Sequence, residues 1–355
     1  VGLDDNPASL SVAIRAGKAN TLWLLKPGEG LQWDLETGAT LRHQVLPPAV
    51  DALLETKSGR TFAWSLDHIY ELDADEWKLT PASPQTDVEE VNTVIETAQG
   101  HLLISTLTAL SEWVLEGDGA MRLLHRLDSG KNFRGLVEEA GGGFLVGSNE
   151  EGIFHYQDGE ITLRVPFEKN PSARVSCMHR AKNGRLWSGA LDLGVACFQD
   201  GRWEWYGDLR GIPRGGVSVI AEDPRGNIWA QVDGGGILRY VPSPDSPETT
   251  MRLNPGKIAQ GDRSVFQFDA VDPWEVTPRD DLVYSWRIRE ADGVETVWTP
   301  FSSERSTISP HLSAGDYVFE VRAADTDFNV DPTPARALFS VMPPLWATPG
   351  FLLPM

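Results

Sequence analysis

Residues 184–195 read G-R-L-W-S-G-A-L-D-L-G-V, and residues 226–237 read G-N-I-W-A-Q-V-D-G-G-G-I. Each stretch has a turn residue, a large apolar residue three positions later, and a second apolar segment about seven or eight positions after that. The pattern occurs six times, with its large apolar residue at Trp23, Phe62, Leu103, Leu145, Trp187 and Trp229, at spacings of 39, 41, 42, 42 and 42. Such a period predicts one small folding unit per repeat.

A further strand is predicted before each turn residue. The seventh position before the turn is mostly small: Ala13, Ala52, Thr93, Gly135, Cys177 and Val219. A small side chain suits the innermost strand of a sheet that is crowded near a central axis. A fourth strand is visible at residues 202–206. Four short strands per unit of about 42 residues are typical of a β-propeller blade. The six repeats, between about residues 9 and 243, predict an all-β propeller of six or seven blades.

A second, smaller β domain is predicted after the linker-like stretch P-S-P-D-S-P at 242–247. Apolar and polar residues alternate in four longer segments, at 264–270, 282–288, 317–323 and 337–341. About 85 residues with seven or so short strands suggest an immunoglobulin- or fibronectin III-like β-sandwich. We expect Tyr317 to tie a loop back to this sandwich. The expected domains are a propeller over 1–245, a sandwich over 246–345 and a tail over 346–355.

Composition excludes several classes of protein. The 51 acidic and 31 basic side chains leave a formal charge of −20, which disfavours nonspecific nucleic-acid binding. There is no run of about 18 apolar residues that would span a membrane. Cys177 and Cys197 are expected on the first and third strands of one blade. Such strands lie about 9–10 Å apart, beyond the roughly 7 Å reach of a disulfide, so we predict free thiols.

The order of these elements resembles a known family of sensors. The repeats at 184–195 and 226–237 resemble two-component-regulator propeller repeats, and residues 256–342 resemble the triple-tyrosine (Y_Y_Y) domain that follows such propellers. The resemblance of the second part rests on Tyr284-Ser285-Trp286-Arg287, Trp298, the turn from Leu312 to Tyr317 with Val321-Arg322-Ala323, and Pro343-Pro344-Leu345-Trp346. Repeats two to four depart from the family pattern, because Phe62, Leu103 and Leu145 replace its tryptophan, and the usual Gly-Thr after the tryptophan is missing.

The resemblance implies a periplasmic sensor domain of an inner-membrane two-component protein. In that family a transmembrane helix follows the tail, and a histidine kinase or diguanylate cyclase forms the cytoplasmic output. Many such sensors respond to carbohydrates, so the implied partner is a small extracellular ligand such as an oligosaccharide, and the implied assembly is a homodimer of the full-length protein. By itself, the uncharged tail at 343–355 fits either a docked end or a domain cut before a membrane segment. The family favours the second interpretation and often adds another propeller upstream.

Motifs of catalysis are missing from the sequence. It contains no G-x-S-x-G, H-E-x-x-H or G-x-x-x-x-G-K-[ST], its seven histidines are scattered, and no cofactor is predicted. Asp325, Asp327 and Asn329 occupy positions 1, 3 and 5 of an EF-hand-type loop, but Val330 and Arg336 stand at positions 6 and 12. We therefore expect a solvated acidic loop there. The sensor domain is expected to be non-catalytic. The alternatives are a propeller polysaccharide lyase or glycosidase, and a protein-interaction scaffold.

One rim of the predicted propeller carries the candidate ligand residues. The eighth position before the turn holds Asp51, Asn92 and Arg134 in three successive repeats, and Arg174 and Arg214 lie near the same rim. Three arginines on one rim of an acidic protein could clamp an anionic ligand such as a uronic acid or a sulfate through bidentate hydrogen bonds. Alternatively, the arginines pair with Glu89, Glu90 and Asp51 across the rim.

Overall fold

The structure is a computed structural model that describes residues 13–16, 21–34, 36–84, 89–117, 120–139, 141–149, 151–166, 174–191, 194–207, 212, 215–223, 225–233, 236–273 and 276–344. The chain forms two compact units, Val1–Phe198 with Trp205–Arg239, and Gln199–Glu204 with Tyr240–Met355. Within the described ranges the fold is all-β, apart from the short 3-10 helix η3 (Arg279–Asp281), and no helix there is long and apolar enough to cross a membrane.

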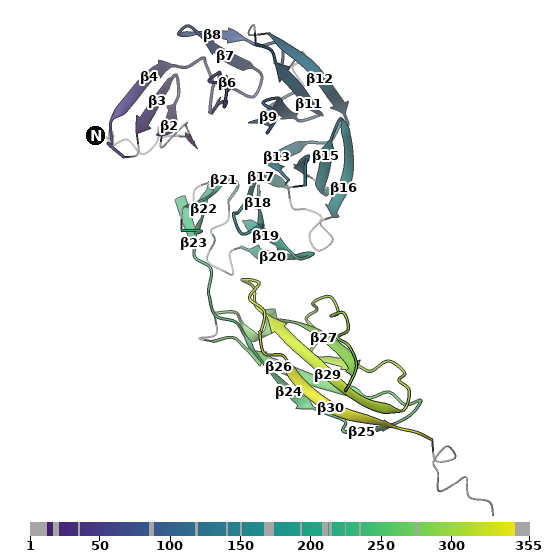
Figure 1. The fold of residues 1–355 in the computed structure, drawn as a ribbon. Helices are drawn as coiled ribbons and strands as arrows, with labels where there is room; N and C mark the ends of the chain where they lie inside the picture. Colours follow the sequence, from purple (N-terminus) through teal and green to yellow (C-terminus); the bar gives the residue numbers. More distant parts are fainter. Residues whose placement is uncertain are drawn as a thin grey trace, which may run out of the picture. The chain divides into compact units, whose positions relative to one another are not determined.

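The repeated part of the chain forms six antiparallel sheets whose strands pair in sequence order (Figure 1). Five have four strands and the last has three. Their bounds, sheet by sheet, are as follows: β1 (Ala13–Ala16), β2 (Thr21–Lys26), β3 (Glu29–Asp34), β4 (Thr40–Val45); β5 (Ala52–Glu55), β6 (Thr61–Trp64), β7 (Ile69–Asp73), β8 (Glu76–Leu79); β9 (Val91–Glu96), β10 (Leu102–Thr106), β11 (Ala109–Leu115), β12 (Met121–Asp128); β13 (Phe133–Glu138), β14 (Phe144–Ser148), β15 (Gly152–Gln157), β16 (Glu160–Pro166); β17 (Val175–Arg180), β18 (Leu186–Ala190), β19 (Val195–Gln199), β20 (Arg202–Tyr206); β21 (Val217–Glu222), β22 (Ile228–Val232), β23 (Gly236–Tyr240).

The first strands of most successive sheets contact one another, as the innermost strands of propeller blades do. Contacts join β1 with β5, β9 with β13, β13 with β17, and β17 with β21. The small residue predicted on these strands has a physical reason at Gly135, where a Cβ atom would lie 2.9 Å from the backbone nitrogen of Met178 on the next first strand. The predicted turn glycines between first and second strands all have positive φ: Gly59, Gly100, Gly142, Gly184 and Gly226.

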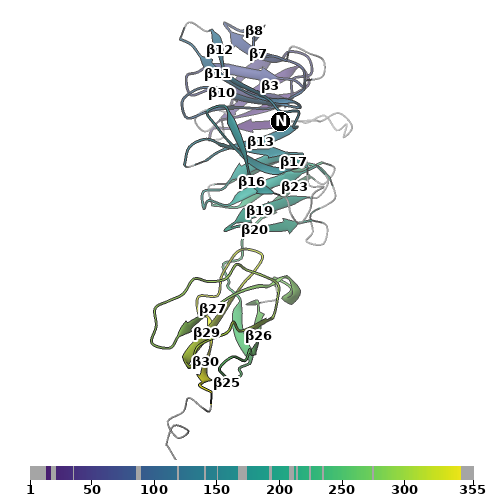
Figure 2. The ribbon, with the colours of Figure 1, turned by 90° about the vertical axis from the view of Figure 1, so that its right-hand side faces the viewer.

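Apolar side chains fill the space between neighbouring sheets. For example, Leu103 and Leu110 of the third sheet share a core with Phe133 and Phe154 of the fourth, whose rings meet edge to face with centroids 5.9 Å apart. Figure 2 shows the sheets of the first unit from the side; within each sheet neighbouring strands are antiparallel, as in β5 to β8. The stability of each sheet therefore depends on its neighbours, as expected for a repeat protein.

The second unit has two packed sheets. One has the order β24 (Glu248–Leu253), β26 (Val265–Val271), β28 (Ser306–Ile308), and the other has the order β25 (Lys257–Ala259), β30 (Ala335–Met342), β29 (Gly315–Ala324), β27 (Val283–Glu290). Strand β25 pairs with β30 in parallel, and the other pairs are antiparallel. Phe266 and Phe319 stack between the two sheets with ring centroids 4.2 Å apart. As predicted, Tyr317 ties a loop back, because its hydroxyl donates to the carbonyl of Ser313 (3.1 Å).

A buried carboxylate on β29 contacts arginines of both neighbouring strands. Glu320 is 1% exposed and lies 2.6 Å from Arg287 Nε on β27 and 2.9 Å from Arg336 Nε on β30. Trp298 packs over the guanidinium groups of Arg287 and Arg322, at 4.4 Å and 4.2 Å from its ring centroid. The strand register explains this meeting, because Glu320 is paired with Arg287 on one side and with Arg336 on the other.

The expectation of a solvated acidic loop at Asp325–Asn329 is wrong. Asp325 and Asp327 are buried, with 1% and 6% of their surfaces exposed. Hydrogen bonds take the place of water: Asp325 accepts from the backbone nitrogen of Asn329 (2.7 Å), and Asp327 accepts from that of Ser243 (2.8 Å). Burial raises the pKa of Asp325. The sequence places a loop at these residues, but in the fold the carboxylates of Asp325 and Asp327 are buried instead of solvated.

The two cysteines are free, as the sequence predicts. Cys177 lies on β17 and Cys197 on β19, which are separated by β18. Burial raises the pKa of Cys177 to about 11, so this thiol is protonated at neutral pH.

Candidate functional site

The rim that carries the predicted ligand residues is held by a repeated backbone hydrogen bond. We call it the entry face: it comprises the segment before each first strand, the turn between second and third strands, and the end of the fourth strand. The nitrogen that follows the second strand donates to the carbonyl that precedes the first strand, in four consecutive sheets. These bonds are Leu107 N to Glu90 O (3.0 Å), Asn149 N to Asn132 O (3.1 Å), Leu191 N to Arg174 O (3.0 Å) and Asp233 N to Gly216 O (2.8 Å).

A β-bulge follows this bond in the same four sheets. Pairing of the first strand with the second shifts by one residue near the start of β9, β13, β17 and β21. The residues without a cross-strand partner are Asn92, Gly135, Ser176 and Ser218. A bulge bends its strand and changes the direction of the side chains beside it. The second sheet has no such shift, since Ala52 pairs directly with Trp64, so Asp51 lies just outside its strand.

The bulged side chains connect neighbouring sheets. Asn92 Nδ2 donates to the carbonyl of Phe133 (2.8 Å) and to Asn132 Oδ1 (3.0 Å) at the start of the next sheet. Ser176 Oγ makes the corresponding bond to the carbonyl of Val217. The predicted ligand residue Asn92 thus has a structural task, because its amide donors hold two sheets together.

Arg134 on β13 and Arg174, just before β17 of the next sheet, are near enough for their charges to interact. Arg134 is half-buried, and its Nε donates to Asn132 Oδ1 (3.3 Å). Burial lowers the pKa of Arg134, the charge of Glu90 opposes this change, and the like charge of Arg174 adds to it. Within the described ranges no carboxylate forms an ion pair with Arg134. A half-buried guanidinium beside a second arginine is stabilised by an added anion.

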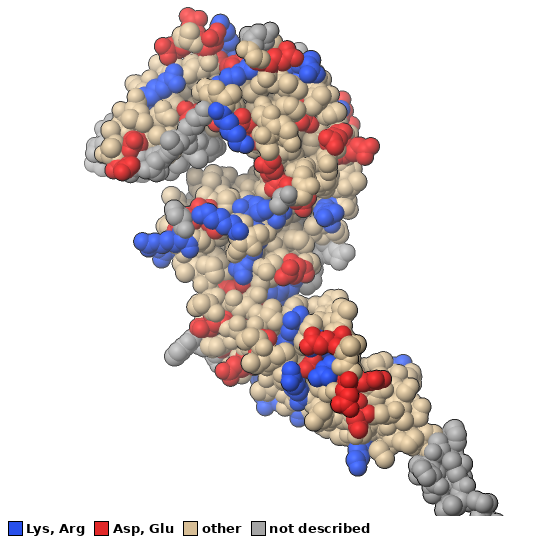
Figure 3. Space-filling view, viewed as in Figure 1, with Lys and Arg blue, Asp and Glu red and all other residues tan. Residues whose placement is uncertain are grey.

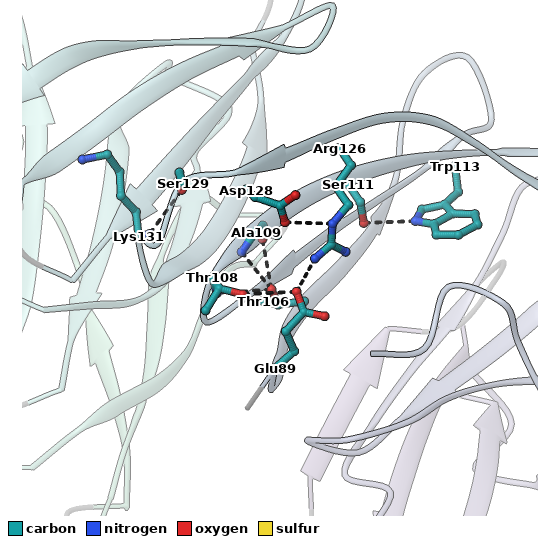
Figure 4. Close-up of polar contacts among 10 residues, drawn as sticks. All are labelled: Glu89, Thr106, Thr108, Ala109, Ser111, Trp113, Arg126, Asp128, Ser129 and Lys131. Carbon is teal, nitrogen blue, oxygen red and sulfur yellow. Dashed lines mark hydrogen bonds and ion pairs between the residues drawn. The ribbon is translucent and has the colours of Figure 1, made fainter. Parts of the chain in front are cut away.

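Glu89 does not pair with the predicted arginines. Its buried carboxylate forms an ion pair with Arg126 from the end of β12 and accepts a hydrogen bond from the hydroxyl of Thr108 (3.1 Å), as Figure 4 shows. Arg126 Nε also donates to Asp128 (2.8 Å). Burial alone would lower the pKa of Arg126, but the hydrogen bonds and charges of Glu89 and Asp128 outweigh it and raise that pKa. The alternative pairing is therefore wrong for Glu89.

Arg126, Thr108 and Asp128 also belong to this face, although the sequence pattern does not predict them. They belong to the second-to-third turn and to the fourth strand, whereas the prediction considered only the entry to each first strand. The four-strand pattern itself contained the signal, because the second-to-third turn and the end of the fourth strand lie at the same edge of a sheet as the entry to the first. Of the other predicted residues, Asp51 is exposed and donates its backbone nitrogen to Trp64 O (3.3 Å), and Arg214 lies outside the described residues.

The second sheet brings a serine, an aspartate and a histidine together in its entry-face turn. Ser65 Oγ donates to Asp67 (2.7 Å), and His68 Nδ1 lies 3.0 Å from the same carboxylate oxygen. A triad would need the serine hydroxyl bonded to the imidazole, with the aspartate behind it. Here both partners meet the aspartate, so the geometry does not activate the serine. In the part of the chain that the structure describes, no group of three or more His, Cys, Asp or Glu side chains is arranged to hold a metal ion.

Comparison with solved structures shows which proteins have a similar fold. No family model matches the chain, and no curated protein does. Among solved structures, it is similar to the extracellular domain of a protein assigned to the hybrid two-component systems of B. thetaiotaomicron (15% identity, TM-score 0.52, covering 96% of this chain and 56% of that one). It is also similar to a streptogramin B lyase (16%, TM-score 0.51, 65% and 85%) and to virginiamycin B lyase from Staphylococcus aureus (13%, TM-score 0.51, 64% and 83%).

The chain spans about half the length of the two-component neighbour. At identities this low the likeness concerns the fold alone. It agrees with the all-β, propeller-type arrangement of the repeated sheets. Figure 3 shows basic (blue) and acidic (red) side chains interspersed on the visible face of the first unit.

Proposed function

We propose that this chain is the ligand-sensing extracytoplasmic part of a membrane-bound two-component signalling protein. The observation that carries the proposal is the fold likeness to an extracellular two-component domain over 96% of this chain. The order of repeats, second β unit and Pro-Pro-Leu-Trp tail supports it through the family resemblance. The proposed location is the periplasm, with a transmembrane helix and a kinase or cyclase output following in the full-length homodimer.

The second unit is proposed to be the immunoglobulin- or fibronectin III-like sandwich of a Y_Y_Y domain. Its two packed sheets and the Tyr317 hydrogen bond support this assignment. The proposed domains are the propeller over 1–245, the sandwich over 246–345 and the tail over 346–355. A ligand that binds one conformation of the sensor better than another would shift the population towards it, and the sandwich would transmit that shift.

The entry face is the proposed ligand site. Arg134 and Arg174 would bind the acidic group, while Asn92 and Asp51 would border the site, and Arg214 remains a ligand residue proposed from the sequence alone. The half-buried Arg134 without an ion pair in the described ranges supports an anionic ligand such as an acidic oligosaccharide. Burying a charged group without a counter-charge is unfavourable, so an incoming carboxylate or sulfate regains part of that free energy.

The test is calorimetric titration of the 355-residue chain with oligogalacturonate and with a sulfated oligosaccharide. Binding should weaken about tenfold or more in Arg134→Ala and Arg174→Ala. Arg164→Ala is the matched control, because Arg164 is an exposed arginine on β16 of the same sheet as Arg134. Equal binding by all variants, or no binding by the wild type, refutes the proposed site. The full-length gene product tests the class: a sequence without a transmembrane span and output domain contradicts it.

A second candidate function is a propeller lyase, which the fold likeness to streptogramin B lyase favours. Turnover would require acid and base groups that converge on one substrate. Incubation of the purified chain with a polysaccharide panel and with a streptogramin B antibiotic separates the two functions, since product formation would favour the enzyme over the sensor.

A further inference from the structure

The turn between β17 and β18 carries the one Asn-Gly pair of the sequence, Asn183 and Gly184. Both residues are exposed. The nitrogen of Gly184 donates to the carbonyl of Ala181 (2.9 Å), so Asn183 is the third residue of a β-turn. Four other sheets have the same turn hydrogen bond, and the residues that occupy the position of Asn183 in them are Ser58, Gln99, Gly141 and Arg225.

An asparagine followed by a glycine can lose its side-chain amide without an enzyme. The glycine nitrogen gives up its proton and bonds to the side-chain carbonyl carbon of the asparagine, and the amide nitrogen leaves as ammonia, so a succinimide ring forms. Water then adds to one of the two ring carbonyl carbons and opens the ring. One opening produces an aspartate, and the other produces an isoaspartate, whose main chain contains an additional methylene group. Glycine favours ring closure because no Cβ crowds its nitrogen.

Three features of this turn favour the reaction at Asn183. A Cβ atom on Gly184 would meet nothing within 4 Å, so the ring has room to form. The backbone nitrogen of Arg185 donates to Asn183 Oδ1 (3.1 Å), where it stabilises the negative charge that develops on this oxygen during the attack. Arg180 Nη1 donates to the carbonyl of Gly184 (3.0 Å), and its positive charge favours loss of the Gly184 proton.

The turn hydrogen bond opposes the reaction, because the Gly184 nitrogen must leave the carbonyl of Ala181 before it can attack. Exposed turns open locally at a small free-energy cost, so this bond slows the reaction and does not prevent it.

The same turn holds the fifth sheet against the sixth. The backbone nitrogen of Lys182 donates to Glu222 Oε2 (2.8 Å) at the end of β21. The side chain of Glu222 is 8% exposed, and His179 Nε2 lies 3.9 Å from the same oxygen. An isoaspartate at position 183 would lengthen the main chain directly after Lys182 and add a carboxylate near that of Glu222. Both changes weaken the hydrogen bond between Lys182 and Glu222.

We propose that Asn183 is a site of spontaneous deamidation, and that isoaspartate formation there loosens the junction between the fifth and sixth sheets. The reaction needs only water as a co-reactant. The proposal does not depend on a ligand or on the entry face, because the turn lies at the opposite ends of β17 and β18.

The junction between the second and third sheets provides an internal reference. The backbone nitrogen of Lys57 donates to Glu96 Oε2 (2.7 Å), as that of Lys182 does to Glu222. Ser58 follows Lys57 and has no amide to lose. This junction should therefore stay unchanged while the other one loosens.

The test is incubation of the whole 355-residue chain at mildly alkaline pH, followed by peptide mapping with mass spectrometry. We expect aspartate and isoaspartate to replace Asn183, and to form faster as pH rises, because the attacking nitrogen must lose a proton. Gln99 in the equivalent turn should remain unchanged, since its longer side chain has to close a larger ring. Asn183→Gln should likewise remain unchanged at position 183.

Hydrogen exchange of the incubated protein provides a second readout. Protection of peptides from β21 (Val217–Glu222) should fall about tenfold or more in the modified molecules, because a buried carboxylate loses a hydrogen bond. Peptides from β9 (Val91–Glu96), and the incubated Asn183→Gln variant, should keep their protection. The proposal is overturned if Asn183 stays intact under conditions that convert a Lys-Asn-Gly-Arg peptide, or if the isoaspartate form keeps the protection of β21.

Discussion

Replacement of Glu320 by alanine should be among the most damaging single changes in the second unit. The carboxylate is 1% exposed, and its closest partner Arg287 is 8% exposed, so Glu320→Ala leaves a buried guanidinium without its main counter-charge. Breaking a buried ion pair in this way costs about 3–5 kcal/mol. Glu295 remains 3.2 Å from Arg287 but is 79% exposed and compensates only in part. We therefore expect a loss near the lower limit, about 3 kcal/mol.

Two companion variants separate charge burial from packing. Arg336 contacts Glu320 at 2.9 Å but is 64% exposed, so Arg336→Ala should cost less than about 1 kcal/mol. The double variant Glu320→Leu with Arg287→Met removes both charges at similar volume. It should be less damaging than Glu320→Ala alone, because the most buried guanidinium is removed with its carboxylate and only the more accessible Arg289 and Arg336, 19% and 64% exposed, lose an ion pair.

Hydrogen exchange followed by mass spectrometry is the appropriate assay, because it reports the stability of β29 separately from that of the repeated sheets. The opening free energy of peptides from Gly315–Ala324 should fall by about 3 kcal/mol in Glu320→Ala. A loss below about 1 kcal/mol, or an equal loss in Arg336→Ala, would refute the reasoning, since the buried charge would then have no special cost.

Three further predictions concern other parts of the chain. Gly147→Ala should destabilise the first unit by about 1–3 kcal/mol or more in urea denaturation, because its Cβ would overlap the side chain of Val175 on the next sheet; unchanged stability would contradict the close packing. Burial and nearby like charges raise the pKa of Asp272 in the folded state. The contribution of Asp272 to the free energy of unfolding is therefore complete below the pKa of the unfolded state, and it is lost as pH rises through the pKa of the folded state. Asp272→Asn should remove that part of the pH dependence, which calorimetric melting at several pH values would check; identical slopes would disprove it. Glu89→Gln should lose about 1–3 kcal/mol through its weakened bond to Arg126, and melting curves that match the wild type would show that this pair is not stabilising.

The repeated sheets could be predicted because each repeat carries its own turn and apolar residues. As expected, the turn glycines lie between the first and second strands of their sheets, and the large residue that follows each turn lies on the second strand. Trp229 shows the limit of the pattern: it matches Trp187 in sequence but is 37% exposed, whereas Trp187 is 2% exposed. The sequence of a repeat specifies its own sheet, but how deeply a side chain such as Trp229 is buried depends on the neighbouring sheets.

Contacts between distant segments could not be predicted. Nothing in the local sequence of Glu320 shows that Arg287 and Arg336 flank it, because the register of three strands decides that meeting. The repeat alignment predicts Arg134 and Arg174 on one rim, but it does not predict the role of Asn92, which depends on a bulge that leaves no clear sequence signal. Arg126 lies on a fourth strand, outside the first-strand pattern from which the ligand residues were predicted.

The position of β30 has a consequence for the order in which the protein is made. In each repeated sheet a strand pairs with the next one synthesised, so these sheets can form as the chain leaves the ribosome. In the second unit, the last strand lies between β25 and β29. Neither of these strands has its neighbour on that side until synthesis passes Met342. The second unit is therefore completed only after translation of its last strand, and any segment encoded further downstream emerges behind a unit that has just become able to fold.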